Sequence, residues 1–240
     1  MPAAAPWHDF WQDFLRADDP VLAAPSYQAG YPARLADGRH LLLPIRVLPG
    51  DGTRAVASLI TNQASFRVLD AIADVLTAEV AQDGADIVIA VPTLGLPLAE
   101  GVARRLGHPR MAALSTSRKF WYDEGLSEPL TSVTSPQQTK RIYLDPRSLT
   151  LLAGRRILLI DDVLSTGTSM SAVLRLLVKA GRPPAAIGVA MTQTQAWQPA
   201  LAQTGSHWPA LVRSAMSTPL LVPHHDGGWQ PDTMGVRATG

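Results

Sequence analysis

Two adjacent carboxylates, Asp161 and Asp162, stand between an apolar run and a hydroxyl-rich loop. The loop consists of Ser165, Thr166, Gly167, Thr168 and Ser169. Backbone N–H groups of such a loop, with a helix N-terminus behind them, form a concavity suited to a phosphate group. Carboxylates repel phosphate, but they accept hydrogen bonds from sugar hydroxyls or from the water shell of Mg²⁺. A phosphate pocket beside a hydroxyl-binding acid pair describes a site for ribose 5-phosphate.

The elements that position these groups alternate between strand and helix. Apolar runs predict the strands, and apolar residues at spacings of three and four predict the helices. The strands cover residues 86–91, 156–161 and 186–191, with shorter ones at 54–61 and 110–116, and the helices cover 65–80, 95–107 and 169–180. This alternation predicts an α/β fold with a parallel sheet covered on both faces. Ligands of such sheets gather at the carboxyl ends of the strands, where the acid pair falls.

The N-terminal part of the chain carries two further signals. Residues 7–16 place five apolar side chains at helical spacing, which predicts a short helix packed on the domain or on a partner subunit. These side chains are Trp7, Phe10, Trp11, Phe14 and Leu15. Residues 40–52 suggest a strand interrupted by Pro44, and therefore a strand at the edge of a sheet.

Composition excludes several classes of protein. The 240 residues are 46% hydrophobic, which supports a real core, and the net charge of +1 argues against general affinity for nucleic acid or acidic membranes. The absence of cysteine excludes disulfides, thiolate metal sites and a cysteine nucleophile. No apolar run approaches the roughly 18 residues of a membrane span, and the start lacks the pattern of a secretion signal. The sequence therefore predicts a soluble, cytoplasmic protein.

Residues 157–169, Ile-Leu-Leu-Ile-Asp-Asp-Val-Leu-Ser-Thr-Gly-Thr-Ser, resemble the signature by which type I phosphoribosyltransferases bind phosphoribosyl pyrophosphate (PRPP). The alternative is an ordinary strand–turn–helix with a capping hydroxyl and solvated carboxylates. The resemblance implies a central, mostly parallel sheet flanked by helices, with a small hood over the base site. It implies an N-terminal helix with possible hood or edge elements in 1–60, a core in 61–200, and a possible hood contribution from 201–240.

A second loop resembles the family's pyrophosphate-binding element. Residues 88–107 form a predicted strand, turn and helix in which Thr93, Leu94 and Gly95 occupy the loop. In the family this loop cradles pyrophosphate with backbone amides and often carries a cis peptide bond that does not precede proline. Taken alone, the stretch is only a strand, a turn and a helix.

Arg118 and Lys119 follow a predicted strand and resemble the basic pair that adenine-branch enzymes place near pyrophosphate, the arginine commonly reaching into the neighbouring subunit. The alternative is a basic turn on the surface. The polar residues 120–146 fall where the family has a mobile flap that excludes water. Within them Ile142–Asp145 is similar to a Tyr-x-Leu-Glu of the adenine enzymes, although the rest departs from the family's flaps, so roles for Tyr143 and Asp145 are weakly supported.

The implied reaction moves the 5-phosphoribosyl group from PRPP to a nucleobase, a purine being favoured, with release of pyrophosphate. Asp161 and Asp162 would hold the ribose hydroxyls and contact Mg²⁺ through water, and Arg118 and Lys119 would neutralise pyrophosphate. The resemblance also implies a homodimer, with PRPP and a base as partners and neither nucleic acid nor membrane. Two alternatives stay open: a regulator of the same fold that binds PRPP or nucleotides, and a PRPP-making kinase, for which no ATP site is identified.

Overall fold

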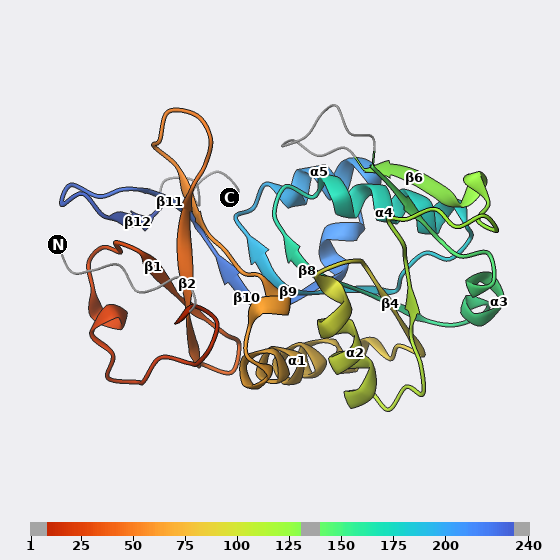
Figure 1. The fold of residues 1–240 in the computed structure, drawn as a ribbon, viewed down its shortest axis with the longest axis horizontal. Coiled ribbons are helices and arrows are strands. Elements are labelled where there is room, and N and C mark those ends of the chain that lie inside the picture. The colour runs from red at the N-terminus through yellow and green to blue at the C-terminus, as the bar shows by residue number, and fades with distance from the viewer. Residues whose placement is uncertain (1–8, 131–139, 233–240) are drawn as a thin grey trace.

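A five-stranded parallel sheet forms the centre of the protein in a computed structural model that describes residues 9–130 and 140–232 (Figure 1). Its strands are β4 (Ile87–Ala90), β5 (Ala112–Ala113), β8 (Ile157–Leu164), β9 (Ala186–Gln193) and β10 (Val212–Thr218). They lie in the order β10-β9-β8-β4-β5, and every neighbouring pair is parallel. The predicted α/β fold is confirmed.

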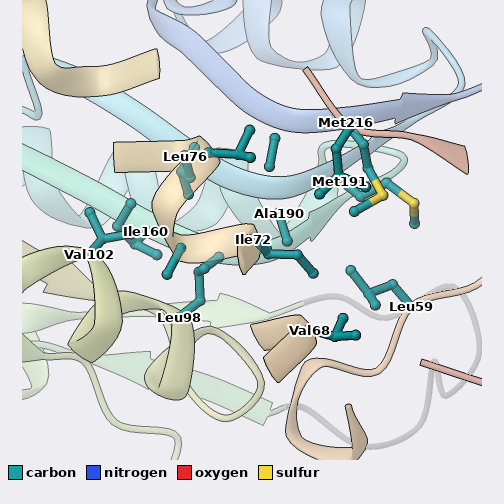
Figure 2. Packing of buried hydrophobic residues seen from close by; sticks show 14 of the residues in the cluster. Leu59, Val68, Ile72, Leu76, Leu98, Val102, Ile160, Ala190, Met191 and Met216 are labelled. Carbon is teal, nitrogen blue, oxygen red and sulfur yellow. The ribbon is translucent and has the colours of Figure 1, made fainter. Parts of the chain in front are cut away.

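Helices cover both faces of this sheet. The longer ones are α1 (Phe66–Val80), α2 (Gly95–Arg105), α4 (Thr168–Lys179) and α5 (Trp197–Thr204), and α3 (Ser148–Leu152) is one short turn. Successive side chains of a strand point to opposite faces, so β8 sends Leu158 and Ile160 toward α1 and α2, and Ile157 and Leu159 toward α4. Figure 2 shows Ile160 packed among side chains of α1 and α2. This two-sided burial explains the unbroken apolar run that precedes the acid pair.

A second, antiparallel sheet is built from both terminal parts of the chain (Figure 1, left). Its strands are β1 (Gly30–Arg34), β2 (His40–Val47), β3 (Ala55–Ala57), β11 (Leu220–Pro223) and β12 (Trp229–Pro231), in the order β1-β2-β3-β11-β12. We call it the terminal sheet. It is tied to the central sheet by a bridge between Leu35 and Met216 and by a 2.6 Å hydrogen bond from Gln193 Nε2 to the Ala57 carbonyl.

The prediction of an edge strand at Pro44 is wrong, because β2 lies between β1 and β3. Pro44 has no N–H to offer, yet its carbonyl accepts from the Ser58 amide at 3.0 Å. The carbonyl of Ser58 accepts instead from the indole Nε1 of Trp11, also at 3.0 Å. A side-chain donor therefore substitutes for the missing amide, and an interior proline is tolerated.

The predicted N-terminal helix is also absent from the described part of its range, residues 9–16. Trp11 has a left-handed backbone with φ of 65°, which an α-helix cannot contain, and Phe14 pairs with Leu41 as an isolated bridge. Phe10 and Trp11 are nevertheless buried in the core. These apolar side chains thus pack on the domain, one of the two expected outcomes, but from an irregular segment; Trp7 lies outside the described residues.

Two boundaries of the parallel sheet also differ from prediction. The strand expected at 110–116 is reduced to the two residues of β5, and β10 adds a strand that lies beyond the expected core boundary at residue 200. The remaining segments are short: η2 (Pro20–Ala23), η3 (Thr61–Gln63), η4 (Ala81–Asp83), η5 (Glu124–Leu126), η6 (Trp208–Leu211), and the ribbon strands β6 (Ser127–Leu130) and β7 (Lys140–Tyr143). Within the described residues, no helix has the length and apolarity that crossing a membrane requires.

Candidate active site at the carboxyl edge of the parallel sheet

Three segments that are distant in sequence meet at one edge of the central sheet. Strands β5, β4 and β8 are neighbours and run parallel, so the carboxyl end of β8 and the segments that follow all three strands lie at the same edge. These segments are 114–119, 91–95 and 161–169. They contain every residue that the sequence proposed for the site.

The acid pair lies directly against the loop after β4. Asp161 is 9% exposed, and its Oδ1 accepts a 2.8 Å hydrogen bond from the Asp162 amide. Gly95 opens α2 so close to this strand that a Cβ on it would stand 3.0 Å from the Asp161 Cα and 3.2 Å from Oδ1. Any larger residue at position 95 would push the two elements apart. The sequence of the loop therefore allows direct contact between the candidate sugar site and the candidate pyrophosphate site.

Burial disfavours the ionised form of both carboxyls. The pKa of Asp161 is raised well above its ordinary value, chiefly by burial and then by the neighbouring Asp162 carboxylate. Burial also raises the pKa of Asp162. Two like charges held in a poorly solvated place are an unfavourable arrangement in the free protein, which a cation or hydroxyl donors would relieve. Such an arrangement is typical of functional sites.

This cost leads to a prediction about stability. Replacing Asp161 with asparagine is expected to raise the free energy of unfolding near pH 8 by about 0.5–2 kcal/mol, which is roughly 2–4 °C in Tm per kcal/mol. A carboxyl with a raised pKa holds its proton more tightly in the folded chain, so stability falls as pH rises from the ordinary 3.8 toward the raised value and stays low above it. The advantage of asparagine should therefore vanish near about pH 4.

Thermal melts at the two pH values measure this difference. Asp145 provides a control of opposite sign, because its ion pair with Arg147 lowers the pKa of Asp145 to about 2. Asp145→Asn should lower Tm at neutral pH, and its effect should be lost only as pH falls toward that value. A D161N variant that melts below the wild type near pH 8 would contradict the proposed electrostatic cost.

The hydroxyl loop turns sharply into α4. Gly167 has φ of 81°, and a Cβ there would meet Leu201 Cδ1 at 2.9 Å and Ala200 Cβ at 3.0 Å. Ser171 N donates to the Gly167 carbonyl at 2.8 Å and closes the first turn of the helix. In the described part of the chain, the amides of Thr166 and Ser169 donate to no backbone carbonyl. Such amides at a helix start are free to bind an anion.

The loop after β4 has the cis peptide bond expected from the resemblance, between Pro92 and Thr93. Thr93 is exposed, whereas Leu94 is half-buried. The hydroxyl of Thr61, which is completely buried, donates to the Leu94 carbonyl at 2.6 Å. This contact fixes the loop to the segment that enters the central domain. No sequence signal pointed to Thr61, because an isolated threonine has no characteristic spacing.

The basic pair is brought to the same edge but not into contact with the acids. Arg118 Nε forms a 2.7 Å ion pair with Glu124 Oε1, within the chain. Lys119 is exposed, and its ammonium has no ion pair with any described residue. Neither side chain hydrogen-bonds to the acid pair or to the hydroxyl loop in the described part of the chain. Both cations therefore follow β5 at this edge of the sheet, Arg118 in an ion pair with Glu124 and Lys119 with an exposed side chain.

Within the segment predicted as a flap, 120–146, strands β6 and β7 form an antiparallel ribbon that is preceded by a turn and η5. Its connection, residues 131–139, lies outside the described residues. Tyr143 is 6% exposed and its amide and carbonyl both bond to Ser115, while Asp145 pairs with Arg147 at 2.5 Å. These two residues are fixed at the base of the ribbon, which gives no support to a role for them at a flap tip.

Within segments 91–95, 114–119 and 161–169, the only carboxylate or imidazole side chains are those of Asp161 and Asp162. No group of three or more His, Asp or Glu side chains that could hold a metal ion occurs among residues 9–130 and 140–232. Two carboxylates without further protein ligands suit Mg²⁺ that arrives with a phosphate-bearing substrate and keeps several waters. Two cavities, of about 340 Å³ beside Arg110 and Arg147 and of about 280 Å³ beside Arg34 and Met216, are lined by neither Asp161 nor Asp162.

Comparison with known proteins supports one interpretation of this edge. A family model described as "Phosphoribosyl transferase domain" matches residues 56–202. The adenine phosphoribosyltransferase of Mycolicibacterium smegmatis is 30% identical over 145 residues, which are 60% of this chain and 73% of that protein. A "probable purine biosynthesis transcriptional regulator PurR" of Streptococcus pneumoniae is 30% identical over 134 residues, 55% of this chain and 46% of that one.

A solved structure shares the fold. The APRTase of Giardia lamblia, complexed with 9-deazaadenine, superposes with a TM-score of 0.55 at 22% identity, over 75% of this chain and 94% of that one. The family match covers all three segments at the carboxyl edge and ends before β10. Residues 9–55, which include β1 and β2 of the terminal sheet, lie outside it.

Proposed function

The chain belongs to the phosphoribosyl transferase family, and from this premise we propose that it transfers the 5-phosphoribosyl group of PRPP to a purine base and releases pyrophosphate. The observation that carries the proposal is the convergence at one sheet edge of an acid pair, a glycine-containing hydroxyl loop and a second loop that touches the acids through Gly95. The purine is favoured because the enzymes among its relatives include adenine phosphoribosyltransferases.

Each part of the edge suits one part of PRPP. The amides and hydroxyls of residues 165–169 would hold the 5-phosphate at the N-terminus of α4. Asp161 and Asp162 would accept hydrogen bonds from the ribose hydroxyls. Because neighbouring strand residues face opposite sides, one of them would contact the sugar less directly. Amides of residues 93–95 would hold the pyrophosphate, with Arg118 and Lys119 neutralising its charge.

Catalysis in this arrangement needs no protein nucleophile. A ring nitrogen of the base attacks C1 of the ribose and releases its proton to solvent, the bond from C1 to pyrophosphate breaks, pyrophosphate leaves, and the transition state resembles an oxocarbenium ion. The residues at the edge would act by positioning the donor and by stabilising the charge of the leaving group. Mg²⁺ bound to the donor would add positive charge at the pyrophosphate, and Asp161 and Asp162 would hold its water shell. The β6–β7 ribbon would carry the segment that excludes water.

The terminal sheet is our candidate for the hood over the base. It is joined to the carboxyl end of β9, which is next to the acid-bearing strand β8, by the bond from Gln193 to Ala57. A base seated above the acid pair would therefore lie near residues 192–197 and the adjoining strand β3. The homodimer and the cytoplasmic location stay predictions, because no described feature tests them.

A substrate panel tests the proposed reaction. Labelled PRPP with Mg²⁺ is incubated with adenine, guanine, hypoxanthine, xanthine, uracil or orotate, and nucleotide and pyrophosphate are measured. We expect turnover with a purine, and no turnover with uracil or orotate. Turnover confined to a pyrimidine would refute the purine assignment, and PRPP binding without turnover of any base would refute the transferase.

A regulator that binds PRPP is the second candidate, favoured by the similarity to the Streptococcus pneumoniae protein. That similarity covers 46% of the other protein, so it says nothing about the rest of its length. A net charge of +1 gives little support to a nucleic-acid-binding role. Pyrophosphate release that requires an added base separates the enzyme from the regulator.

A further inference from the structure

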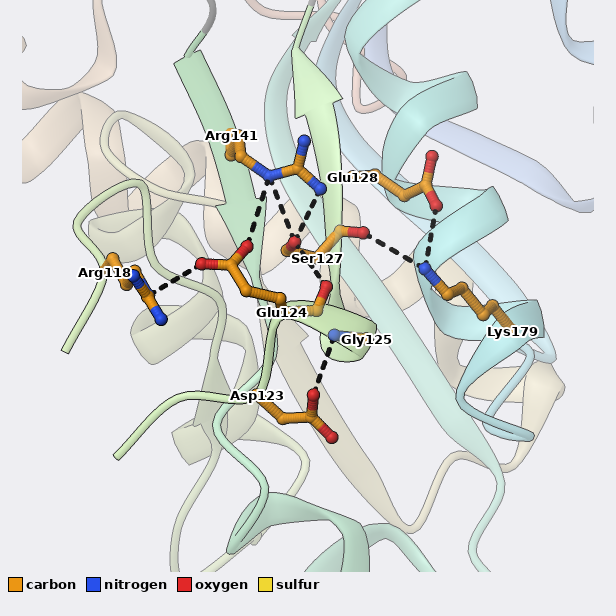
Figure 3. Close-up of polar contacts among 8 residues, drawn as sticks. All are labelled: Arg118, Asp123, Glu124, Gly125, Ser127, Glu128, Arg141 and Lys179. Atoms are coloured by element: carbon orange, nitrogen blue, oxygen red, sulfur yellow. Dashed lines mark hydrogen bonds and ion pairs between the residues drawn. The ribbon is translucent and has the colours of Figure 1, made fainter. Parts of the chain in front are cut away.

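Glu124 stands between two arginines at the start of the flap ribbon (Figure 3). Its Oε1 lies 2.7 Å from Arg118 Nε, and its Oε2 lies 3.9 Å from Arg141 Nε. Arg118 belongs to the candidate pyrophosphate site, whereas Arg141 belongs to strand β7 of the ribbon. One carboxylate thus has a close partner in the active site and a second, looser partner in the flap.

The backbone around this carboxylate is held in place. Asp123 Oδ1 accepts from the Gly125 amide at 2.8 Å, and Ser127 Oγ donates to the Glu124 carbonyl at 2.8 Å. Arg141 Nη2 donates to the same Ser127 hydroxyl at 2.7 Å, and Ser127 is 1% exposed. The side chain of Glu124 is half-exposed and, among the described residues, is held only by its ion pairs with the two arginines. A rotation is sufficient to exchange one arginine for the other.

Pyrophosphate is a stronger partner for Arg118 than a carboxylate is. It carries more negative charge and offers paired oxygens that match the guanidinium fork. An exposed carboxylate–arginine pair is worth little in water, so it can be displaced at small cost. Once displaced, the Glu124 carboxylate remains beside Arg141, whose Nε already lies at 3.9 Å.

We propose that Glu124 is a competing counter-ion, which occupies Arg118 while the pyrophosphate site is empty and transfers to Arg141 when pyrophosphate takes Arg118. The inference rests on the proposed function, since it requires pyrophosphate at Arg118. It makes Glu124 a positioning residue that links occupancy of the site to the base of the flap. Binding at one place and ion pairing at the other are then coupled, and the coupling is reciprocal.

The test is calorimetric titration of pyrophosphate with Mg²⁺ into the full chain. Glu124→Gln keeps the shape but removes the competing charge, so affinity should rise about two- to fivefold, the range set by exposed ion pairs. In an Arg118→Ala background, the same change should have no effect. Glu128→Gln is the matched control: Glu128 also sits on the ribbon between two cations, Arg175 and Lys179, but contacts neither Arg118 nor Arg141.

A double-mutant cycle tests the transfer of Glu124 to Arg141. Arg141→Met removes the second partner, so pyrophosphate affinity should fall about two- to fivefold, and this loss should disappear when Glu124→Gln is also present. A purely structural effect of losing the bond to Ser127 would persist in both backgrounds and would overturn the transfer. If the wild type binds pyrophosphate and Glu124→Gln binds it with the same affinity, the competition between Glu124 and pyrophosphate is overturned but the proposed function is not. No binding by the wild type would overturn the proposed function together with this inference.

Discussion

Replacing Asp161 and Asp162 together with asparagine is expected to weaken PRPP binding by at least about 100-fold, since each hydrogen bond to a charged group contributes about 1.5–3 kcal/mol and each 1.4 kcal/mol is tenfold in affinity. Asparagine keeps the size of both side chains, and its carbonyl can still accept the 2.8 Å bond from the amide of residue 162. The variant should therefore fold. What it loses is the charge that binds sugar hydroxyls and the water shell of Mg²⁺.

Calorimetry with PRPP and Mg²⁺ measures this loss. Asp70→Asn with Asp74→Asn is the matched control, because it makes the same change in net charge on α1, where both carboxylates pair with Arg105. That control should bind PRPP like the wild type. If the D161N/D162N variant also kept its affinity, the acid pair would have no part in the site and the assignment of the whole sheet edge would fail.

The features that could be predicted from the sequence are those whose cause is local. The run 157–160 is aliphatic because β8 is buried on both faces, and the start of α4 lies within one residue of the predicted boundary because Gly167 and the hydroxyls mark it. Once those strands are known to be parallel, the meeting of their loops at one edge follows from geometry alone. The acid pair and both loops were therefore predictable.

The features that could not be predicted depend on contacts between distant residues. Pro44 sits inside a sheet because the indole of Trp11, 33 positions earlier, supplies a hydrogen bond to Ser58. Strand β10 has the sequence Val-Arg-Ser-Ala-Met-Ser-Thr, without the apolar run of the other strands, and is recruited by its ladder with β9. Pairing of this kind produces no periodic pattern of apolar residues in the sequence.

Glu124 belongs to the same group of unpredicted residues. The polar segment around it has no period, and its partners come from a loop after β5 and from the strand β7. The sequence predicts Arg118 near the candidate pyrophosphate site, and in the structure Arg118 lies in the segment after β5. It could not show that Glu124 pairs with Arg118, because that pairing depends on how the segment between β5 and β6 folds.

Gly167→Ala is expected to destabilise the fold and to disable the phosphate loop together. A left-handed backbone costs a non-glycine residue about 1–2 kcal/mol, and overpacking a filled site adds about 1–3 kcal/mol. The new methyl group would stand 2.9 Å from Leu201 Cδ1 and 3.1 Å from the Trp197 carbonyl, both on α5. A total of about 2–5 kcal/mol corresponds to a fall in Tm of roughly 5–15 °C for a chain of this size.

Relief of that clash would move the loop away from α5 and out of register with the acid pair. A misplacement of about 1 Å can cost about 100-fold in rate, so kcat/KM for PRPP should fall by that order even where the variant is fully folded. Gly181→Ala separates the two contributions. Gly181 also has a left-handed backbone, with φ of 67°, but nothing lies within 4 Å of the added Cβ. It should therefore lose stability alone, about 1 kcal/mol, and keep its kcat/KM. Equal activity in the two alanine variants would show that the turn at Gly167 does not hold the phosphate.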